Sequence, residues 1–212
     1  DPAFYVWQLK GKSYPTIIYH HGNNERPFDF SRYAKNSFKK IFGEAKKPIH
    51  ANVIALRAPF HQGSLKDYQK KIAKMENFVA MLSVSVKLGE TIIQRLKQEG
   101  YTQPVLFSGI SLGGWVTNLH HSYYNTADIY APLLAGAALD HLFTGSVYRK
   151  MAGKPARNQP QKVKEILNFE EAFQQVPHDK VYPLLGRYDQ YIVFDRQRLS
   201  YGNRPIHITE KG

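Results

Sequence analysis

Short hydrophobic runs alternate along the chain with longer stretches whose apolar residues recur at helical spacing. The runs are rich in β-branched and aromatic residues and are bounded by turn-forming residues, a pattern that predicts strands. The predicted strands are 4–10, 15–21, 52–56, 104–108, 129–134, 181–185 and 205–209. The stretches with helical spacing predict helices over 28–42, 66–98 in two pieces, 112–124 and 160–167.

The order of these elements indicates the fold. Gly100 follows the long helix as its cap, and Asn168 begins another helix with Glu171 as the capping partner. Strands that alternate with helices at this spacing predict an α/β fold with a mostly parallel central sheet and helices on both faces. Residues 141–178 contain no predicted strand, so we expect them to form a small helical lid inserted into this domain.

Length and composition indicate one ordinary globular domain. The 212 residues suit a single domain over 1–212, and 42% hydrophobic with 22% charged residues excludes disorder and fibrous repeats. No apolar run approaches the roughly 18 residues of a membrane span, so no membrane insertion is expected. Cysteine is absent, which excludes disulfides, thiolate nucleophiles and cysteine-ligated zinc. The compartment stays open, with the cytoplasm favoured, and the sequence does not indicate an oligomeric state.

The net charge of +12 raises the question of a nucleic-acid partner. Lysine pairs lie in separate polar stretches, at 39–40, 46–47 and 70–71, and no aromatic-rich RNA-binding motif accompanies them. We therefore interpret the charge as a solvated basic surface and expect no nucleic-acid partner.

The predicted strand 104–108 leads into Gly109-Ile110-Ser111-Leu112-Gly113, and a helical pattern follows directly. Gly-x-Ser-x-Gly between a strand and a helix is typical of a nucleophile elbow. We expect side chains at Gly109 and Gly113 to obstruct so tight a turn, and Ser111 to be exposed above the sheet edge. A serine held there can attack a carbonyl carbon once a base takes its proton.

Two further motifs accompany the elbow. His20-His21-Gly22-Asn23 follows an early buried strand, and Gly186-Arg187-Tyr188-Asp189 follows a late one. Together with the elbow, they resemble the α/β-hydrolase superfamily over nearly the whole chain. The resemblance implies an oxyanion hole formed by the backbone N–H groups of Asn23 and Leu112, with Asp189 as the acid of the triad. Asp140, which follows the preceding strand, is its rival, and Asp195 is a further alternative.

The histidine of such a triad is the point at which this chain departs from the family. The family places it in the loop after the last strand, and the sequence ends at Gly212 where that loop begins. His207 lies between Asp189 and Gly212, but inside the predicted strand 205–209, where packing residues are expected. Either the base follows Gly212 or the site is degenerate; we favour the first explanation and keep His207 as the fallback.

No metal or cofactor is expected. The neighbours His20-His21 and His120-His121 point in different directions in a strand or a helix, and no carboxylate joins them at ligand spacing. Some other residues are candidates for substrate contact. His61 lies beside Pro59-Phe60, and exposed aromatic residues near the loops favour an apolar substrate. These aromatic residues are Phe28, Phe60, Tyr188 and Tyr191. The apolar residues of the predicted lid suit either a cleft or plain packing, which we favour. They are Phe143, Val147, Tyr148 and Met151.

The sequence therefore predicts a serine hydrolase that cleaves an ester or related acyl bond of a small molecule, through a Ser-His-Asp triad and an acyl-enzyme. An acyltransferase or a peptidase would use the same groups, so both stay open. Because the histidine is not evident, a catalytically degenerate binding module is the alternative from a different class.

Overall fold

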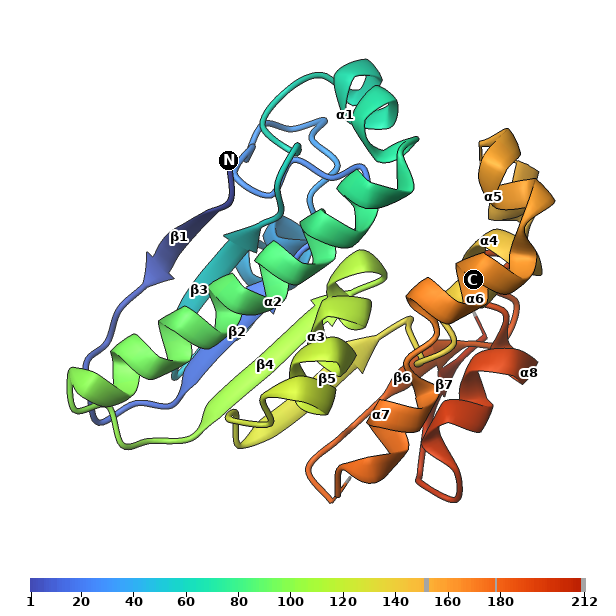
Figure 1. Ribbon diagram of the computed structural model, residues 1–212. Helices are drawn as coiled ribbons and strands as arrows, with labels where there is room; N and C mark the ends of the chain where they lie inside the picture. The colour runs from blue at the N-terminus through green and yellow to red at the C-terminus, as the bar shows by residue number, and fades with distance from the viewer. Residues whose placement is uncertain (151–152, 178, 211–212) are drawn as a thin grey trace.

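The computed structural model describes residues 1–150, 153–177 and 179–210. Seven strands form one sheet in the order β1-β3-β2-β4-β5-β6-β7 (Figure 1). The strands are β1 (Ala3–Gln8), β2 (Thr16–His20), β3 (Asn52–Arg57), β4 (Val105–Ile110), β5 (Ile129–Leu133), β6 (Leu184–Gly186) and β7 (His207–Thr209). Only β1 is antiparallel to its neighbour within this sheet. The predicted mostly parallel α/β sheet is confirmed.

Most of the predicted helices are present. They are α1 (Leu65–Ile72), α2 (Met75–Gln98), α3 (Leu112–Tyr123), α4 (Asp140–Thr144), α5 (Lys154–Asn158), α6 (Pro160–Leu167), α7 (Glu170–Gln175) and α8 (Phe194–Gln197). Three short segments are a π-helix, η1 (Lys39–Gly43), and two 3₁₀ turns, η2 (Val147–Lys150) and η3 (Arg198–Tyr201). The predicted cap of α2 is confirmed, because Gly100 adopts φ +81° and its N–H donates to the Lys97 carbonyl.

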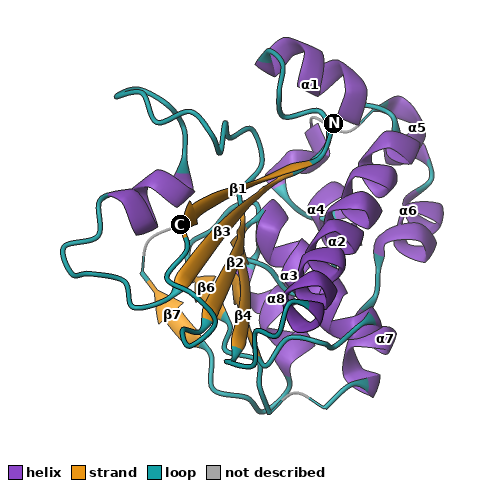
Figure 2. Cartoon of the chain, turned by 90° about the vertical axis from the view of Figure 1, so that its left-hand side faces the viewer, coloured by secondary structure: helices purple, strands orange, loops and turns teal. Residues whose placement is uncertain are grey.

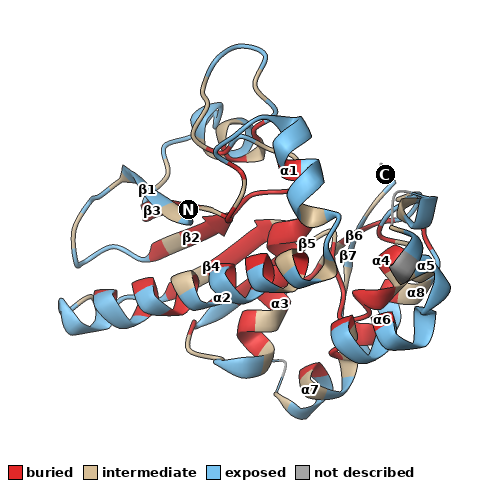
Figure 3. Ribbon diagram, turned by 45° about the horizontal axis from the view of Figure 1, so that its top comes forward, coloured by how far each residue is buried: buried red, intermediate tan, exposed pale blue. Residues whose placement is uncertain are grey.

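The two faces of the sheet are covered unequally. Helices α2, α3 and α7 pack on one face, where residues such as Ile93, Phe107 and Trp115 are fully buried (Figures 2 and 3). The other face is covered by the loop between β2 and β3 and by η1, over a smaller cluster that contains Tyr19 and Phe38. Helical cover is therefore extensive on one face only.

The prediction of an amphipathic helix over 28–42 is wrong. The Asn36 side chain donates to the carbonyls of Pro27 (3.1 Å) and Asp29 (2.8 Å), which holds this segment in turns. A helix begins only at Ser37, whose N–H donates to the Glu25 carboxylate (2.9 Å). The periodic aromatic residues pack instead against β1, as shown by rings stacked 5.1 Å apart. That stacked pair is Trp7 and Phe30.

Residues 141–178 are helical over most of their described part, with α4 to α7 and η2. Helices α4, α5 and α6 lie beyond the arrowheads of β4 and β5, at the end of the sheet where α1 also lies (Figure 1). They therefore border the carboxyl ends of the strands, where ligands bind in open α/β sheets. No described helix combines the length and apolar character that crossing a membrane requires.

Candidate active site

Ser111 occupies a sharp turn between β4 and α3. Its backbone has φ +53° and ψ −108°, a conformation that costs a non-glycine residue about 1–3 kcal/mol. A Cβ at Gly109 would lie 2.5 Å from the Gly113 backbone carbon, and a Cβ at Gly113 would lie 2.1 Å from the His20 carbonyl oxygen. The expectation that this turn excludes side chains at both glycines is confirmed. Ser111 itself is half-exposed and lines a cavity.

The loop after β2 faces the same cavity. Asn23 and Leu112 both line it with Ser111, and neither backbone N–H donates a hydrogen bond to another group in the part of the chain that the structure describes. The Asn23 side chain accepts a hydrogen bond from the Tyr68 hydroxyl, which fixes the loop against α1. Leu112 begins α3, so its N–H also lies at the positive end of a helix dipole.

His21 holds the peptide that precedes Asn23. The Ala58 N–H donates to His21 Nε2 (3.1 Å), so the proton of the neutral ring lies on Nδ1, which donates to the Gly22 carbonyl (2.6 Å). The Gly22 carbonyl and the Asn23 N–H belong to one trans peptide and point in opposite directions. His21 therefore orients the Asn23 N–H. Burial lowers the pKa of His21 well below its usual value, which keeps the ring neutral.

The cavity beside Ser111 has a volume of about 230 Å³. Besides the serine and its two backbone donors, its walls are mainly apolar or aromatic. The main apolar and aromatic residues of the wall are Phe78, Trp115, Leu142, Tyr148, Tyr191 and Ile192. Most of these residues come from segments far apart in the sequence. Tyr148 and Tyr191 are candidates from the sequence, and Trp115, which the sequence analysis missed, lies one helical turn after Ser111.

Asp189 lies in the turn after β6, at the same end of the sheet as Ser111. Its Oδ1 accepts the backbone N–H groups of Tyr191 (2.8 Å) and Ile192 (2.9 Å), whose side chains line the Ser111 cavity. Its Oδ2 makes no hydrogen bond within the described residues. One carboxylate oxygen thus positions the turn and the other is available to a further donor.

The two rival carboxylates have other partners. Asp140 is buried at the start of α4, where its Oδ1 accepts from the Asn168 side chain (2.7 Å). Asp195 is exposed and pairs with Arg198 (3.4 Å). Neither is among the residues that line the Ser111 cavity.

His207 lies across the sheet from Ser111, because Ile110 pairs with Leu133, Leu133 with Leu184 and Leu184 with His207, so three strand spacings of about 4.8 Å each separate β7 from β4. It is the first residue of β7 and pairs with Leu184, the first residue of β6, whereas the Asp189 turn follows the last residue of β6. Its side chain borders a different cavity, with Arg204 and Tyr182. The structure therefore does not bring His207 and Ser111 together.

Solved structures show the same arrangement of elements. The uncomplexed acylaminoacyl peptidase of Pyrococcus horikoshii has a TM-score of 0.62 at 15% identity, over 99% of this chain and 36% of the peptidase. Est1E of Butyrivibrio proteoclasticus, solved with ferulic acid bound, has a TM-score of 0.63 at 14% identity, over 99% of this chain and 84% of that protein. The chain has the α/β-hydrolase fold.

This chain spans about a third of the length of the peptidases it matches, which include a puromycin-hydrolyzing peptidase of Mycobacterium tuberculosis (TM-score 0.56, 14% identity, 94% of this chain and 31% of that one). No protein-family model and no curated protein matches the sequence. Among the described residues, no group of three His, Asp or Glu side chains is arranged to hold a metal ion.

Within the α/β-hydrolase fold, the other predicted contacts are distributed unequally. Tyr148 and Tyr191 line the Ser111 cavity and Phe143 borders a neighbouring one, whereas Val147 borders neither and Met151 lies outside the described residues. His61 is buried, with its ring 4.4 Å from that of His21 and 4.2 Å from that of Tyr68. The remaining aromatic candidates lie outside the cavity wall, and they are Phe28, Phe60 and Tyr188.

Five histidines of the described chain are buried, and burial lowers the pKa of each. They are His20, His21, His61, His120 and His121. The pKa falls to about 4 for His20, His61 and His121. None of these rings borders the Ser111 cavity, so within the described residues none of them is positioned as the base, and His21 acts on the site only through the Gly22 peptide.

Proposed function

We propose that the chain is a serine hydrolase that cleaves an ester or related acyl bond of a small molecule. The observation that best supports this is the strained backbone of Ser111 beside the N–H groups of Asn23 and Leu112, on one cavity. Strained conformations persist where the surrounding structure enforces them, and they concentrate at functional sites.

In the proposed reaction, Ser111 Oγ attacks the acyl carbon and its proton passes to a histidine. The N–H groups of Asn23 and Leu112 donate to the oxyanion, and each such donor typically contributes ~3 kcal/mol. The histidine returns the proton to the leaving alcohol, which gives an acyl-enzyme, and water then attacks this ester by the same steps. Asp189 accepts the second N–H of the histidine and fixes its orientation.

We place this histidine after Gly212. The Arg187 N–H donates to the Thr209 carbonyl (2.9 Å) and the Arg187 side chain pairs with Glu210 (3.0 Å), so β7 ends beside the turn that carries Asp189. These contacts with Arg187 bring the end of β7 close to Asp189, which supports a base in the segment that follows.

The mainly apolar wall of the cavity favours an ester with an apolar acyl group. A peptidase or an acyltransferase would use the same nucleophile and donors, so the assay compares nitrophenyl esters, anilides of short peptides, and transfer to alcohols. Any serine hydrolase cleaves an activated nitrophenyl ester faster than an anilide, so ester cleavage without anilide cleavage or transfer supports the proposal. Cleavage of the anilides identifies a peptidase instead, and transfer to alcohols in preference to water identifies an acyltransferase.

Labelling with a fluorophosphonate tests the nucleophile. We expect a chain that includes the residues after Gly212 to be labelled, Ser111→Ala not to be labelled, and the 212-residue chain to be labelled more slowly because it lacks the base. Absence of labelling in the longer chain would favour the alternative, a binding module without catalysis, which the lack of a histidine on the described cavity wall also motivates.

The acid has a matched control. Asp189→Asn should lower kcat by about 10⁴-fold, as loss of a triad acid does. Asp140→Asn keeps an oxygen that accepts from Asn168, so it should lower kcat less than tenfold. The reverse order of these two effects would assign the acid to Asp140.

A further inference from the structure

A second cavity adjoins the Ser111 cavity. It has a volume of about 690 Å³ and lies between the residues that join α1 to α2 on one side and α5 on the other, with Ile72, Met75 and Ala156 on its wall. Phe78 and Tyr148 line both cavities. A ligand bound at Ser111 can therefore extend past these two rings into the larger space.

A row of aromatic rings follows the junction. Phe78 contacts Phe143 with ring centroids 5.1 Å apart, Phe143 contacts Tyr148 at 5.5 Å, and Tyr148 contacts Tyr191 at 6.3 Å. Burial raises the pKa of Tyr148 above its usual value, so its hydroxyl stays neutral. The path from Ser111 to the larger cavity is thus uncharged and suits the apolar part of a ligand.

Two segments that contribute residues to the wall of the larger cavity form a basic rim, although among the described residues Lys74, paired with Glu76, is the one basic residue on the wall itself. Residues 64–76 and 147–158 contain eight basic and two acidic side chains, so they contribute half of the chain's net charge of +12. The basic residues are Lys66, Lys70, Lys71, Lys74, Arg149, Lys150, Lys154 and Arg157. The two segments are separated by about seventy residues of sequence, but described residues of both, such as Ile72 and Ala156, line this cavity.

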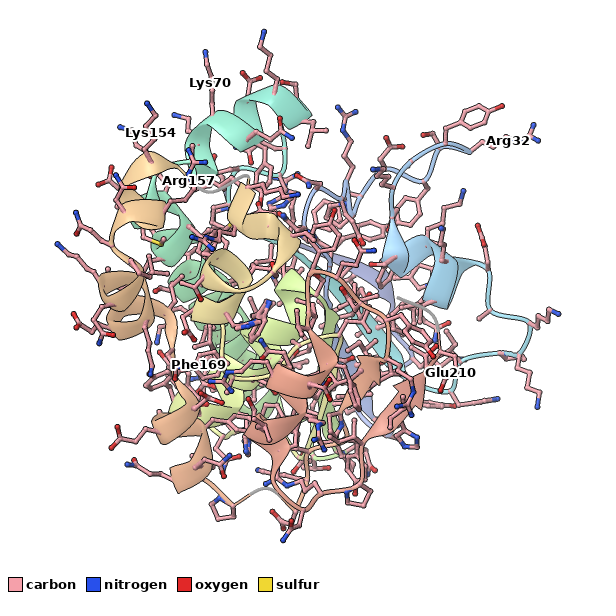
Figure 4. All side chains as sticks on the ribbon, turned by 90° about the vertical axis from the view of Figure 1, so that its right-hand side faces the viewer. Arg32, Lys70, Lys154, Arg157, Phe169 and Glu210 are labelled. Carbon is pink, nitrogen blue, oxygen red and sulfur yellow. The ribbon has the colours of Figure 1, made fainter. Side chains whose placement is uncertain are left out.

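Most of these charges have no acidic partner. Within the described residues only Lys74 forms an ion pair, with Glu76 at 3.9 Å. Lys70 of α1 and Lys154 and Arg157 of α5 lie on one side of the molecule, and Arg32 lies on the opposite side of the same view (Figure 4). Basic residues from two segments far apart in the sequence therefore lie on the same side of the molecule.

We propose that the site takes an amphiphilic acyl substrate whose apolar chain lies in the larger cavity and ends in an anionic group, a carboxylate or a phosphate, held at the basic rim. This inference rests on the proposed function of Ser111. A cleft lined by charge of one sign attracts an oppositely charged substrate and raises its association rate by about 10–10³-fold, and salt weakens the effect.

The test compares two variants of equal net charge. The rim variant carries Lys70→Glu, Lys154→Glu and Arg157→Glu, and the control variant carries three equivalent changes between β2 and β3, a segment whose Arg32 lies on the opposite side of the molecule. The control substitutions are Arg32→Glu, Lys46→Glu and Lys47→Glu. Substrates are nitrophenyl esters with acyl chains of equal length that end in a methyl, a carboxylate or a phosphate group. The measured quantity is kcat/KM for each anionic ester divided by kcat/KM for the methyl ester.

We expect this ratio to be at least tenfold lower in the rim variant than in the control variant at low salt, and the two ratios to converge in 1 M NaCl, where the Debye length falls to about 3 Å. The carboxylate and phosphate arms show which anion the rim prefers. Equal ratios in the two variants would overturn the inference, even if fluorophosphonate still labels Ser111. Absence of labelling in the unsubstituted protein would instead refute the proposed function. Urea unfolding of both variants controls for folding.

Discussion

Gly89 of α2 provides a test of how this helix packs on the sheet. In an exposed helix, Gly→Ala stabilises by about 1 kcal/mol. Here a Cβ would lie 2.3 Å and 2.6 Å from Cε2 and Cζ of Phe107, whereas carbon atoms attract best at about 3.5–4.0 Å. The Phe107 ring is fully buried and stacks on the His120 ring, with ring centroids 4.6 Å apart and an interplanar angle of 11°.

The Phe107 ring has little room to yield. His120 is held on both sides, by the Tyr130 hydroxyl (3.0 Å) and the Glu90 carboxylate (3.1 Å). Overpacking of a core costs about 1–3 kcal/mol. Because the Phe107 ring and the new methyl group would have to separate by more than an ångström, we expect a cost at the upper end of that range. After the gain in helix propensity, we expect Gly89→Ala to lower the free energy of unfolding by about 2 kcal/mol.

Urea unfolding followed by circular dichroism measures this change. The exposed Ser83→Ala on the same helix is the control and should be neutral or slightly stabilising. Adding Phe107→Leu to Gly89→Ala should cost less than the two single changes together, because the smaller side chain frees the space that the new methyl group needs. A Gly89→Ala protein more stable than the unsubstituted one would refute this account of the packing.

Two further predictions concern histidines. His21→Ala should slow fluorophosphonate labelling about tenfold or more without weakening substrate binding equally. His21→Asn should restore part of the labelling rate, because its side-chain amide can donate to the Gly22 carbonyl. Equal labelling rates in the unsubstituted protein and both variants would contradict the role of His21 in orienting the Asn23 N–H. The buried histidines should make the protein acid-labile. His20, His61 and His121 take up protons near pH 6.5 when unfolded but only at about 4 when folded, because burial lowers the pKa of each. The free energy of unfolding therefore falls as the pH drops between these values, by up to about 1.4 kcal/mol per pH unit for each of the three. A urea midpoint that stays constant from pH 7.5 to pH 5 would contradict this.

The strands and the elbow could be predicted because their signals are local. Buried parallel strands appear as short apolar runs, and Gly109 and Gly113 mark a turn whose geometry depends on the backbone alone. The prediction of a strand over 181–185 is less accurate. Val181 forms only an isolated bridge with Tyr130, and the residues that pair with β7 are Leu184 to Gly186. Which residues of an apolar run pair depends on the neighbouring strands, and this information is absent from the run itself.

The segment before η1 and most of the cavity wall, apart from the candidates Tyr148 and Tyr191, could not be predicted for different reasons. The aromatic spacing over 28–42 fits a helix, but the hydrogen bonds of Asn36 with Pro27 and Asp29 stabilise turns instead, and the rings pack on β1. The cavity wall depends on tertiary folding, since Phe78 and Ile192 meet beside Ser111 although more than a hundred residues separate them. The same applies to the basic rim, whose two segments meet only in space.

The strain at Ser111 allows function to be separated from packing. Glycine adopts φ +53° without the steric cost that a Cβ incurs, so a purely structural turn has no reason to keep a side chain here. Ser111→Ala keeps the strain and removes only the hydroxyl, whereas Ser111→Gly also relieves about 1–3 kcal/mol of strain at an entropic cost of about 0.5–1 kcal/mol. We therefore expect Ser111→Gly to be about 1 kcal/mol more stable than Ser111→Ala in urea unfolding, with neither variant labelled by fluorophosphonate. If Ser111→Gly is the less stable of the two, the turn is not strained and the strongest support for a selected nucleophile is lost.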